Sequence, residues 1–316
     1  MTGLDDWSYA KDWAPEQIAY ASAAELAAGR LPLRAQWRLA EQRQRAERGD
    51  PGAFTSDLTV EEFAAIRSVG FAPVGQVLGT AVYQFAAVYQ GCGFIGASPA
   101  GAPVVGLQLA QASLDEARHL AVRRMRFECD ALGGDGVVGV RLGVLPFHDI
   151  GLEFLAIGTA VRAAGAVRPP RPFTCDLSGQ DFTKLIRAGW VPVALLQGVG
   201  VTVRHNDWSQ RIQSLSWANQ ELVGATALIQ GARSVARTGL ARDAARVGAH
   251  TVVLRDLMSR MYERKCLSGY EAHDRIAEVV LWGTGIVPFG RKHRPHPAAT
   301  EPPLPMLRLN PRKETG

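Results

Sequence analysis

An internal duplication limits what this chain can fold into, because both copies must form the same elements in the same order. The segment 57–63 recurs at 176–182, and the correspondence continues without a gap, at a constant offset, as far as Val82 and Val201. Further matches follow in the same order in both copies: Leu132-Gly133-Gly134 with Val247-Gly248-Ala249, Val137-Val138 with Val252-Val253, and Gly158-Thr159-Ala160-Val161 with Gly283-Thr284-Gly285-Ile286. The chain is therefore predicted to contain two copies of one module, residues 57–165 and 176–290, joined by a proline-rich linker over residues 166–175.

Each copy is predicted to form a β-α-β-β module preceded by a short helix, which makes the fold class α+β. Thr59-x-x-Glu62 and Ser178-x-x-Asp181 resemble capping boxes that start the short helices. Gly70 and Gly189 are suited to end them, because glycine adopts left-handed backbone angles. Apolar residues at spacings of three and four predict a longer helix in each copy. The predicted long helices cover 114–132 and 222–247, and the predicted strands cover 71–85, 136–145, 153–162, 190–203, 251–261 and 276–287.

The remaining residues are predicted to form a helical lead, residues 1–56, and a disordered tail, residues 291–316. In the lead, Leu33 and Trp37 belong to an apolar face at helical spacing, and the Gly/Pro cluster at 49–52 indicates a linker. The tail is rich in proline, and six basic and two acidic residues after Phe289 give it +4 of the formal charge of +5. Because the body of the chain is then close to neutral, nucleic acid is not a predicted partner.

Residues 68–114 contain no charged side chain, so a membrane-spanning helix is the first alternative to consider. The corresponding uncharged run in the second copy covers only 188–203, which is shorter than the roughly 20 residues that a spanning helix needs. We therefore expect this stretch to lie in a sheet that packs against another module or chain, and no membrane is a predicted partner. The N-terminus lacks a secretory pattern and the four cysteines show no C-x-x-C spacing, which favours a cytoplasmic protein with reduced thiols.

Two segments of the first copy carry a family resemblance. The run from Ala131 to Arg141, Ala-Leu-Gly-Gly-Asp-Gly-Val-Val-Gly-Val-Arg, is followed by the strand Gly158-Thr159-Ala160-Val161. In both segments the first copy resembles the YbjQ family, often labelled a heavy-metal-binding domain. The second copy resembles a degenerate member, because Leu254 and His250 stand where the first copy has glycine and aspartate. The resemblance implies dodecin-like β-α-β-β subunits that assemble through their sheets as pentamers, and hence a homo-oligomeric ring. Uncovered sheet faces and edges favour self-association on physical grounds as well.

The family label makes a divalent metal ion the first ligand to test, and such an ion needs His, Cys or carboxylate groups at fixed spacings. Asp115 and His119 lie four residues apart on a predicted helix and are the candidate ligands, although such pairs are common on solvated helix faces. Cys129 lies on the apolar stripe and is predicted to be a packed core thiol. Cys92, in an uncharged glycine-rich loop, and the pair His148-Asp149 give weaker signals.

The sequence contains no nucleophile elbow, phosphate loop, zinc-protease or catalytic-triad signature, so the chain is predicted not to be an enzyme. The predicted function is a self-associating scaffold or an assembly that binds an unidentified ligand, with metal-ion binding as the alternative. Phe71, Tyr83 and Trp190 could line a cleft for such a ligand or could fill the core.

Overall fold

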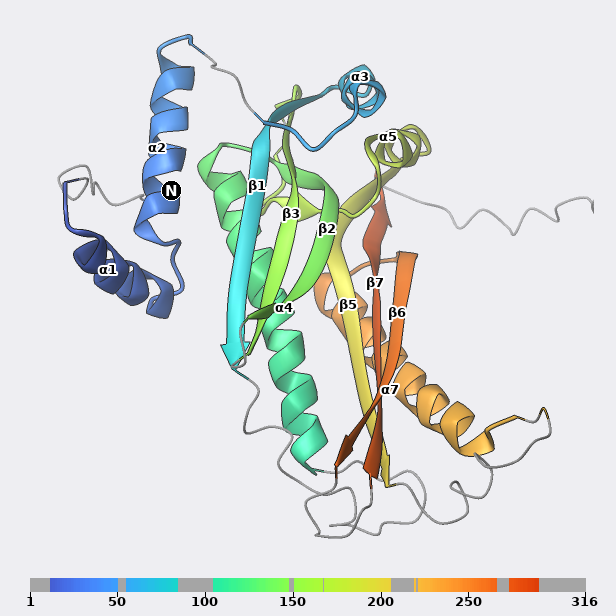
Figure 1. Cartoon of the computed structure of the whole chain (residues 1–316). Coiled ribbons are helices and arrows are strands. Elements are labelled where there is room, and N and C mark those ends of the chain that lie inside the picture. Colours follow the sequence, from blue (N-terminus) through green and yellow to red (C-terminus); the bar gives the residue numbers. More distant parts are fainter. Residues whose placement is uncertain are drawn as a thin grey trace, which may run out of the picture.

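The computed structural model describes residues 12–50, 55–84, 105–147, 151–166, 168–205, 219, 221–265 and 273–289. Over these residues the chain combines helices with two sheets, which confirms the predicted α+β class (Figure 1). The first sheet has the strand order β1-β3-β2-β4, and the second has the order β5-β7-β6. Neighbouring strands are antiparallel except where β4 joins β2.

Among the described residues, the segments predicted as two copies, the halves 57–165 and 176–290, show the same elements in the same order. The first half contains α3 (Val60–Ser68), β1 (Phe71–Gln84), α4 (Val105–Ala131), β2 (Gly136–Phe147) and β3 (Gly151–Ala163). The second half contains α5 (Gly179–Arg187), β5 (Trp190–His205), α7 (Val223–Val247), β6 (Thr251–Lys265) and β7 (His273–Pro288). The strand order repeats as well, because β3 lies between β1 and β2 as β7 lies between β5 and β6.

One strand lies in the segment predicted as a linker. This strand, β4 (Phe173–Thr174), pairs in parallel with Gly136 and Val137 of β2. The Cys175 amide then donates to the Val137 carbonyl oxygen at 2.9 Å. The chain that leaves the first half therefore extends the edge of the first sheet before it enters α5.

The two short helices start at the predicted cap residues and end at the predicted glycines, although only α3 forms the complete capping box. The Glu62 amide donates to the Thr59 hydroxyl at 3.2 Å, and the Thr59 amide donates to the Glu62 carboxylate at 2.9 Å, which completes a capping box. In α5 the Asp181 amide donates to the Ser178 hydroxyl, which itself donates to the Asp181 carboxylate at 2.9 Å. Gly70 and Gly189 follow the helices with φ of 79°, a left-handed angle that favours glycine.

Glycines in β1 and β5 allow each long helix to lie directly on its strand. A Cβ atom added to Gly79 would lie less than 3.0 Å from the Ala121 carbonyl oxygen and the Met125 amide nitrogen in α4. A Cβ added to Gly198 would meet the backbone of Ala236 in α7 equally closely. Real Cβ atoms do not approach so near, so this close packing of helix on strand requires glycine at both positions.

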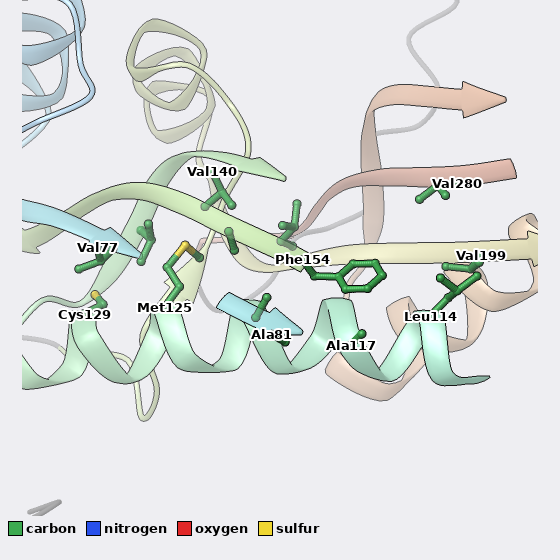
Figure 2. Packing of buried hydrophobic residues seen from close by; sticks show 14 of the residues in the cluster. Val77, Ala81, Leu114, Ala117, Met125, Cys129, Val140, Phe154, Val199 and Val280 are labelled. Atoms are coloured by element: carbon green, nitrogen blue, oxygen red, sulfur yellow. The ribbon is translucent and has the colours of Figure 1, made fainter. Parts of the chain in front are cut away.

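The helix α4 packs between the two sheets. It covers one face of the first sheet, where Val77, Ala81 and Phe154 are buried. Val199 and Val280 of the second sheet belong to the same hydrophobic cluster, so α4 also covers a face of that sheet (Figure 2). One core therefore joins the two halves.

Strands β5 and β7 of the second sheet are covered on both faces, whereas β6 is largely exposed and, among the described residues, the first sheet is covered by a long helix on one face only. On the face opposite α4, helix α7 packs on the second sheet in a cluster of Leu228, Ala232, Ala236, Ala277, Val279 and Leu281. The first sheet also has a face opposite α4, and this face is covered at the end next to α3 and α5. Val138 and Val161 are buried there with Phe173 and Phe182.

The lead forms two helices, α1 (Pro15–Ala27) and α2 (Leu33–Glu47), as its pattern predicts. Leu31 and Leu39 pack against Ala131 at the C-terminal end of α4, and Arg38 forms an ion pair with Glu128 at 2.5 Å. Among the described residues, no helix combines the length and the apolar character that crossing a membrane would need. The predicted disordered tail lies outside the described residues.

Candidate functional site

The predicted ligand pair Asp115 and His119 lies on α4 where this helix meets α7. The two side chains are adjacent, with His119 Nδ1 3.5 Å from Asp115 Oδ1. His119 Nδ1 also lies 2.8 Å from the Asp115 carbonyl oxygen, and Nε2 lies 2.9 Å from Asp243 Oδ2 of α7. Asp243 in turn accepts from Arg246 at 2.9 Å. The pair therefore takes part in a polar contact between the halves, and its closest partner, Asp243, was not a predicted site residue.

Both ring nitrogens of His119 face oxygen acceptors, which favours the doubly protonated imidazolium. The hydrogen bond with Asp243 raises the pKa of His119, although burial opposes the shift. Burial alone would raise the pKa of Asp243, but the hydrogen bond and charge of His119, together with the charge of Arg246, hold that pKa below its usual value. Burial raises the pKa of Asp115, and the Asp243 charge adds to this shift while His119 opposes it.

We expect His119→Gln to destabilise the protein more at about pH 6 than at about pH 8.5. Because the pKa of His119 is raised in the folded state, its stabilising contribution is full below the unfolded pKa and is lost as pH rises through the folded pKa. The difference in the free energy of unfolding should be about 1 kcal/mol at the lower pH, as for a partly exposed ion pair. Urea unfolding at both pH values measures it, with the exposed His250→Gln as control. An effect of His119→Gln that does not change with pH would contradict this assignment.

A buried ion pair between the halves lies farther along α4. Arg118 Nη2 is 3.4 Å from Glu278 Oε1 of β7, and these residues are 4% and 0% exposed. Arg260 of β6 donates to the other Glu278 oxygen at 2.7 and 3.0 Å. The Arg118 guanidinium also lies 5.1 Å from the centre of the Phe154 ring. Burial lowers the pKa of Arg118, and the Glu278 charge opposes the shift. The Glu278 carboxylate therefore links α4 of the first half to β7, and it also links β7 to β6 within the second half.

Sequence reasoning did not identify Glu278, although a signal was present. The predicted strand around it, Ile276-Ala277-Glu278-Val279-Val280-Leu281-Trp282, is apolar apart from this one acid. A charge in such a strand is expected to be paired, because an isolated buried charge is costly. The pattern predicts a partner but cannot say that it comes from the other half.

A cavity of about 790 Å³ lies next to the His119 contact, between α4, α7 and the segment before β4. Its charged lining residues are Arg123, Arg126, Arg168, Arg171, Arg246, His119, Asp135 and Asp243. Asp135 is paired with Arg168, and Asp243 is paired with Arg246. Burial and the nearby charges of Arg171 and Arg123 lower the pKa of Arg126. This excess of positive charge suits an anion better than a metal cation.

The described residues do not fit a heavy-metal site. No group of three or more His, Cys, Asp or Glu side chains among them is placed to hold an ion. A metal at His119 would have to displace either Asp243 or the Asp115 carbonyl oxygen from the ring. Cys129 is fully buried, donates to the Gly136 carbonyl oxygen at 3.3 Å, and burial raises its pKa to about 12. Its predicted role as a core thiol agrees with this placement.

The other sequence candidates lie apart from one another. Phe71 lines the cavity and also packs edge-on against Phe182 at 5.1 Å, whereas Tyr83 packs against the shared core and Trp190 lies 5.6 Å from the His250 ring. Cys92 and the pair His148-Asp149 lie outside the described residues. The three aromatic residues therefore do not form one cleft.

The arrangement defines an α+β protein of two similar halves, whose charged residues mainly join one half to the other. A family model described as "Putative heavy-metal-binding" matches residues 104–164. The chain belongs to this family, the YbjQ family. No solved structure gives a significant match to the chain.

Curated relatives support the family. "Encapsulin nanocompartment protein Rv1762c" of Mycobacterium tuberculosis is 37% identical over 209 residues, which are 64% of this chain and 76% of that protein. A "UPF0145 protein" of Halorubrum lacusprofundi is 49% identical over 49 residues, which are 16% of this chain and 47% of that protein. A "UPF0145 protein" of Pseudothermotoga lettingae is 43% identical over 49 residues, 16% of this chain and 46% of that protein.

Proposed function

We propose that the chain is a non-enzymatic scaffold protein of the cytoplasm that associates with copies of itself. The observation that carries this proposal is an apolar face of the first sheet that the described residues leave partly exposed, which we call the outer face. It lies opposite α4, and its exposed members are Leu78, Val82, Leu145 and Phe147, which are 36–50% exposed. Leu155 and Ile157 of β3 lie between these residues in the register of the strands.

The strand register makes the outer face continuous. Val82 pairs with Glu153, which pairs with Leu145 on its other side, and Leu78 pairs with Ile157. Contiguous apolar surface of this kind marks sites of association more often than isolated exposed residues do. In the second sheet the equivalent face of β5 and β7 is buried under α4, where Val199 and Val280 are almost fully covered. The outer face of the first sheet therefore corresponds to a face that α4 buries in the second sheet.

The comparison with an encapsulin nanocompartment protein agrees with a role in a larger assembly. The family description favours a bound metal, but the charge of the described cavity favours an anion. We therefore propose self-association as the function and treat ligand binding as secondary to it.

We expect wild-type protein to be oligomeric and the double variant Val82→Lys, Leu145→Lys to dissociate at least about tenfold more readily, a change of about 1.4 kcal/mol. Each lysine would place a charge in the apolar contact between copies. In the single chain the same side chains would stay hydrated, because both positions are exposed. Mass photometry over a concentration series measures the distribution of species. Tyr20→Lys is the matched control, because Tyr20 is 83% exposed on α1, away from the outer face. A wild-type protein that remains a single chain at all concentrations would refute the proposal.

A further inference from the structure

We propose that the outer face of one copy is covered by α7 of a second copy, in the way that α4 covers the second sheet within one chain. The proposal rests on the self-association proposed above and specifies its contact. Copies would then join head to tail, with the second half of one chain against the first half of the next. The contact inside the chain serves as the template for the contact between chains.

The contact between the halves can be used to predict the contact between copies, because the two halves correspond residue by residue. Gly79 lies against Ala121 of α4 as Gly198 lies against Ala236 of α7. Counting back three residues along each helix gives Arg118 and Arg233. These two arginines therefore hold the same place on their helices.

The strands give the matching acid. Val77 pairs with Gly158 of β3 as Leu196 pairs with Gly283 of β7. Counting back five residues from these glycines gives Glu153 in β3 and Glu278 in β7. Glu153 thus holds the place in the outer face that Glu278 holds in the face covered by α4.

The charges complete the correspondence. Within the chain Arg118 pairs with Glu278 across the two halves. Arg233 has the equivalent place on α7, and its Nε atom is buried without a hydrogen-bond partner among the described residues. A buried donor of this kind is rare in a complete structure. Glu153 lies between Val82 and Leu145 in the outer face, and among the described residues it forms no ion pair. When α7 of one copy lies on the outer face of the next, Arg233 meets Glu153.

A second equivalent contact lies at the other end of the same interface. Phe182 of α5 is fully buried in a cluster with Val138 of β2, and this contact also joins the two halves. Phe63 of α3 is the equivalent of Phe182 but is only half-buried. Val253 of β6 is the equivalent of Val138 but is 36% exposed. The head-to-tail contact brings Phe63 of one copy onto Val253 of the other. Both residues then become buried, as Phe182 and Val138 are within one chain.

The lead helix α2 borders this interface and leaves the outer face open. Arg38 pairs with Glu128, a residue of α4 that accepts from the Leu78 amide. At the equivalent place in the second half, Asp243 is paired with His119 of α4. In the incoming α7 the place of His119 is held by Ser234, whose short side chain leaves room for Arg38. Arg38 of the lead thus already pairs with Glu128, as His119 pairs with Asp243 at the equivalent place.

The contact is heterologous, because different surfaces of the two copies meet. Such contacts generate closed rings or open filaments, depending on the rotation between copies. A closed ring of whole chains joined in this way contains an even number of halves.

Charge reversal tests the contact. Glu153→Arg and Arg233→Glu should each shift assembled protein towards single chains, with at least a tenfold rise in the concentration at which half of the protein is assembled. Combining the reversals in one chain should restore assembly. An equal mixture of the two single variants should also assemble, because each variant then meets an opposite charge on the other at both of its surfaces. Mass photometry of the separate and mixed proteins provides the readout, with the exposed Glu16→Arg on α1 as control.

The outcomes separate the two proposals. Wild-type protein that never assembles would refute self-association itself. Assembled wild-type protein with both single variants equally assembled would refute the α7 contact alone. Single variants that dissociate but do not reassemble on mixing would also refute it, since a general loss of folding predicts that result. Glu153→Gln and Arg233→Gln, which remove the charge without reversing it, give smaller shifts in the same direction if the contact is correct.

Discussion

Gly198→Ala is expected to lower the free energy of unfolding by at least about 3 kcal/mol. A Cβ atom at this position would lie less than 3.0 Å from the backbone of Ala236, and the neighbouring Gly200 makes the same approach to Ala232. The obstacle is helix backbone rather than a movable side chain. To admit one methyl group, α7 must move away from β5 and weaken the cluster formed by Leu228, Ala232 and Ala236.

Urea unfolding followed by circular dichroism measures the effect. Gly143→Ala is the matched control, because it adds the same methyl group in strand β2, where the nearest atom is the Leu155 Cβ at 3.7 Å. This ordinary contact should cost less than about 1 kcal/mol. Equal losses for the two variants would mean that α7 does not lie on β5 as closely as the structure places it.

The fold was largely predictable because its elements depend on local patterns. The strand predicted over 71–85 is observed as β1, and the helix predicted over 222–247 is observed as α7. The capping residues Thr59 and Ser178 define their helix starts through contacts within three residues. The strand β4 was missed because it has only two residues and depends on pairing with distant Gly136 and Val137. No local pattern contains that information.

Only the part of the site that lies on a single helix was predictable from the sequence. The pair Asp115 and His119 was identified from its spacing, but its partner Asp243 comes from the other half. The apolar stripe of α4 predicted one buried side, whereas α4 contacts both sheets. Arg118 is a polar residue next to that stripe, and its burial follows from the position of the second sheet. Contacts between the halves are set by tertiary packing, which the period of a single helix does not encode.

The buried pair of Arg118 and Glu278 gives the second large expected effect. Glu278→Leu should lower the free energy of unfolding by about 3–5 kcal/mol, because it leaves the buried Arg118 without its charge partner. Arg118→Met should cost less, because Glu278 keeps both hydrogen bonds from Arg260. The two changes differ in the charge that they leave in the core, although each removes the same contact.

Combining the two substitutions distinguishes this pairing from general packing. The double variant should be less destabilised than the sum of the single variants, with a coupling energy of about 1–3 kcal/mol, because neither charge is then left alone. Urea unfolding of the four proteins gives the cycle, and Arg45→Ala, which breaks the exposed pair with Glu41, should change stability by less than about 0.5 kcal/mol. Additive losses would mean that Arg118 and Glu278 act independently, and α4 would then owe its place between the sheets to apolar packing alone. A coupled pair makes the contact between the halves specific in register, since only one position of α4 brings Arg118 to Glu278.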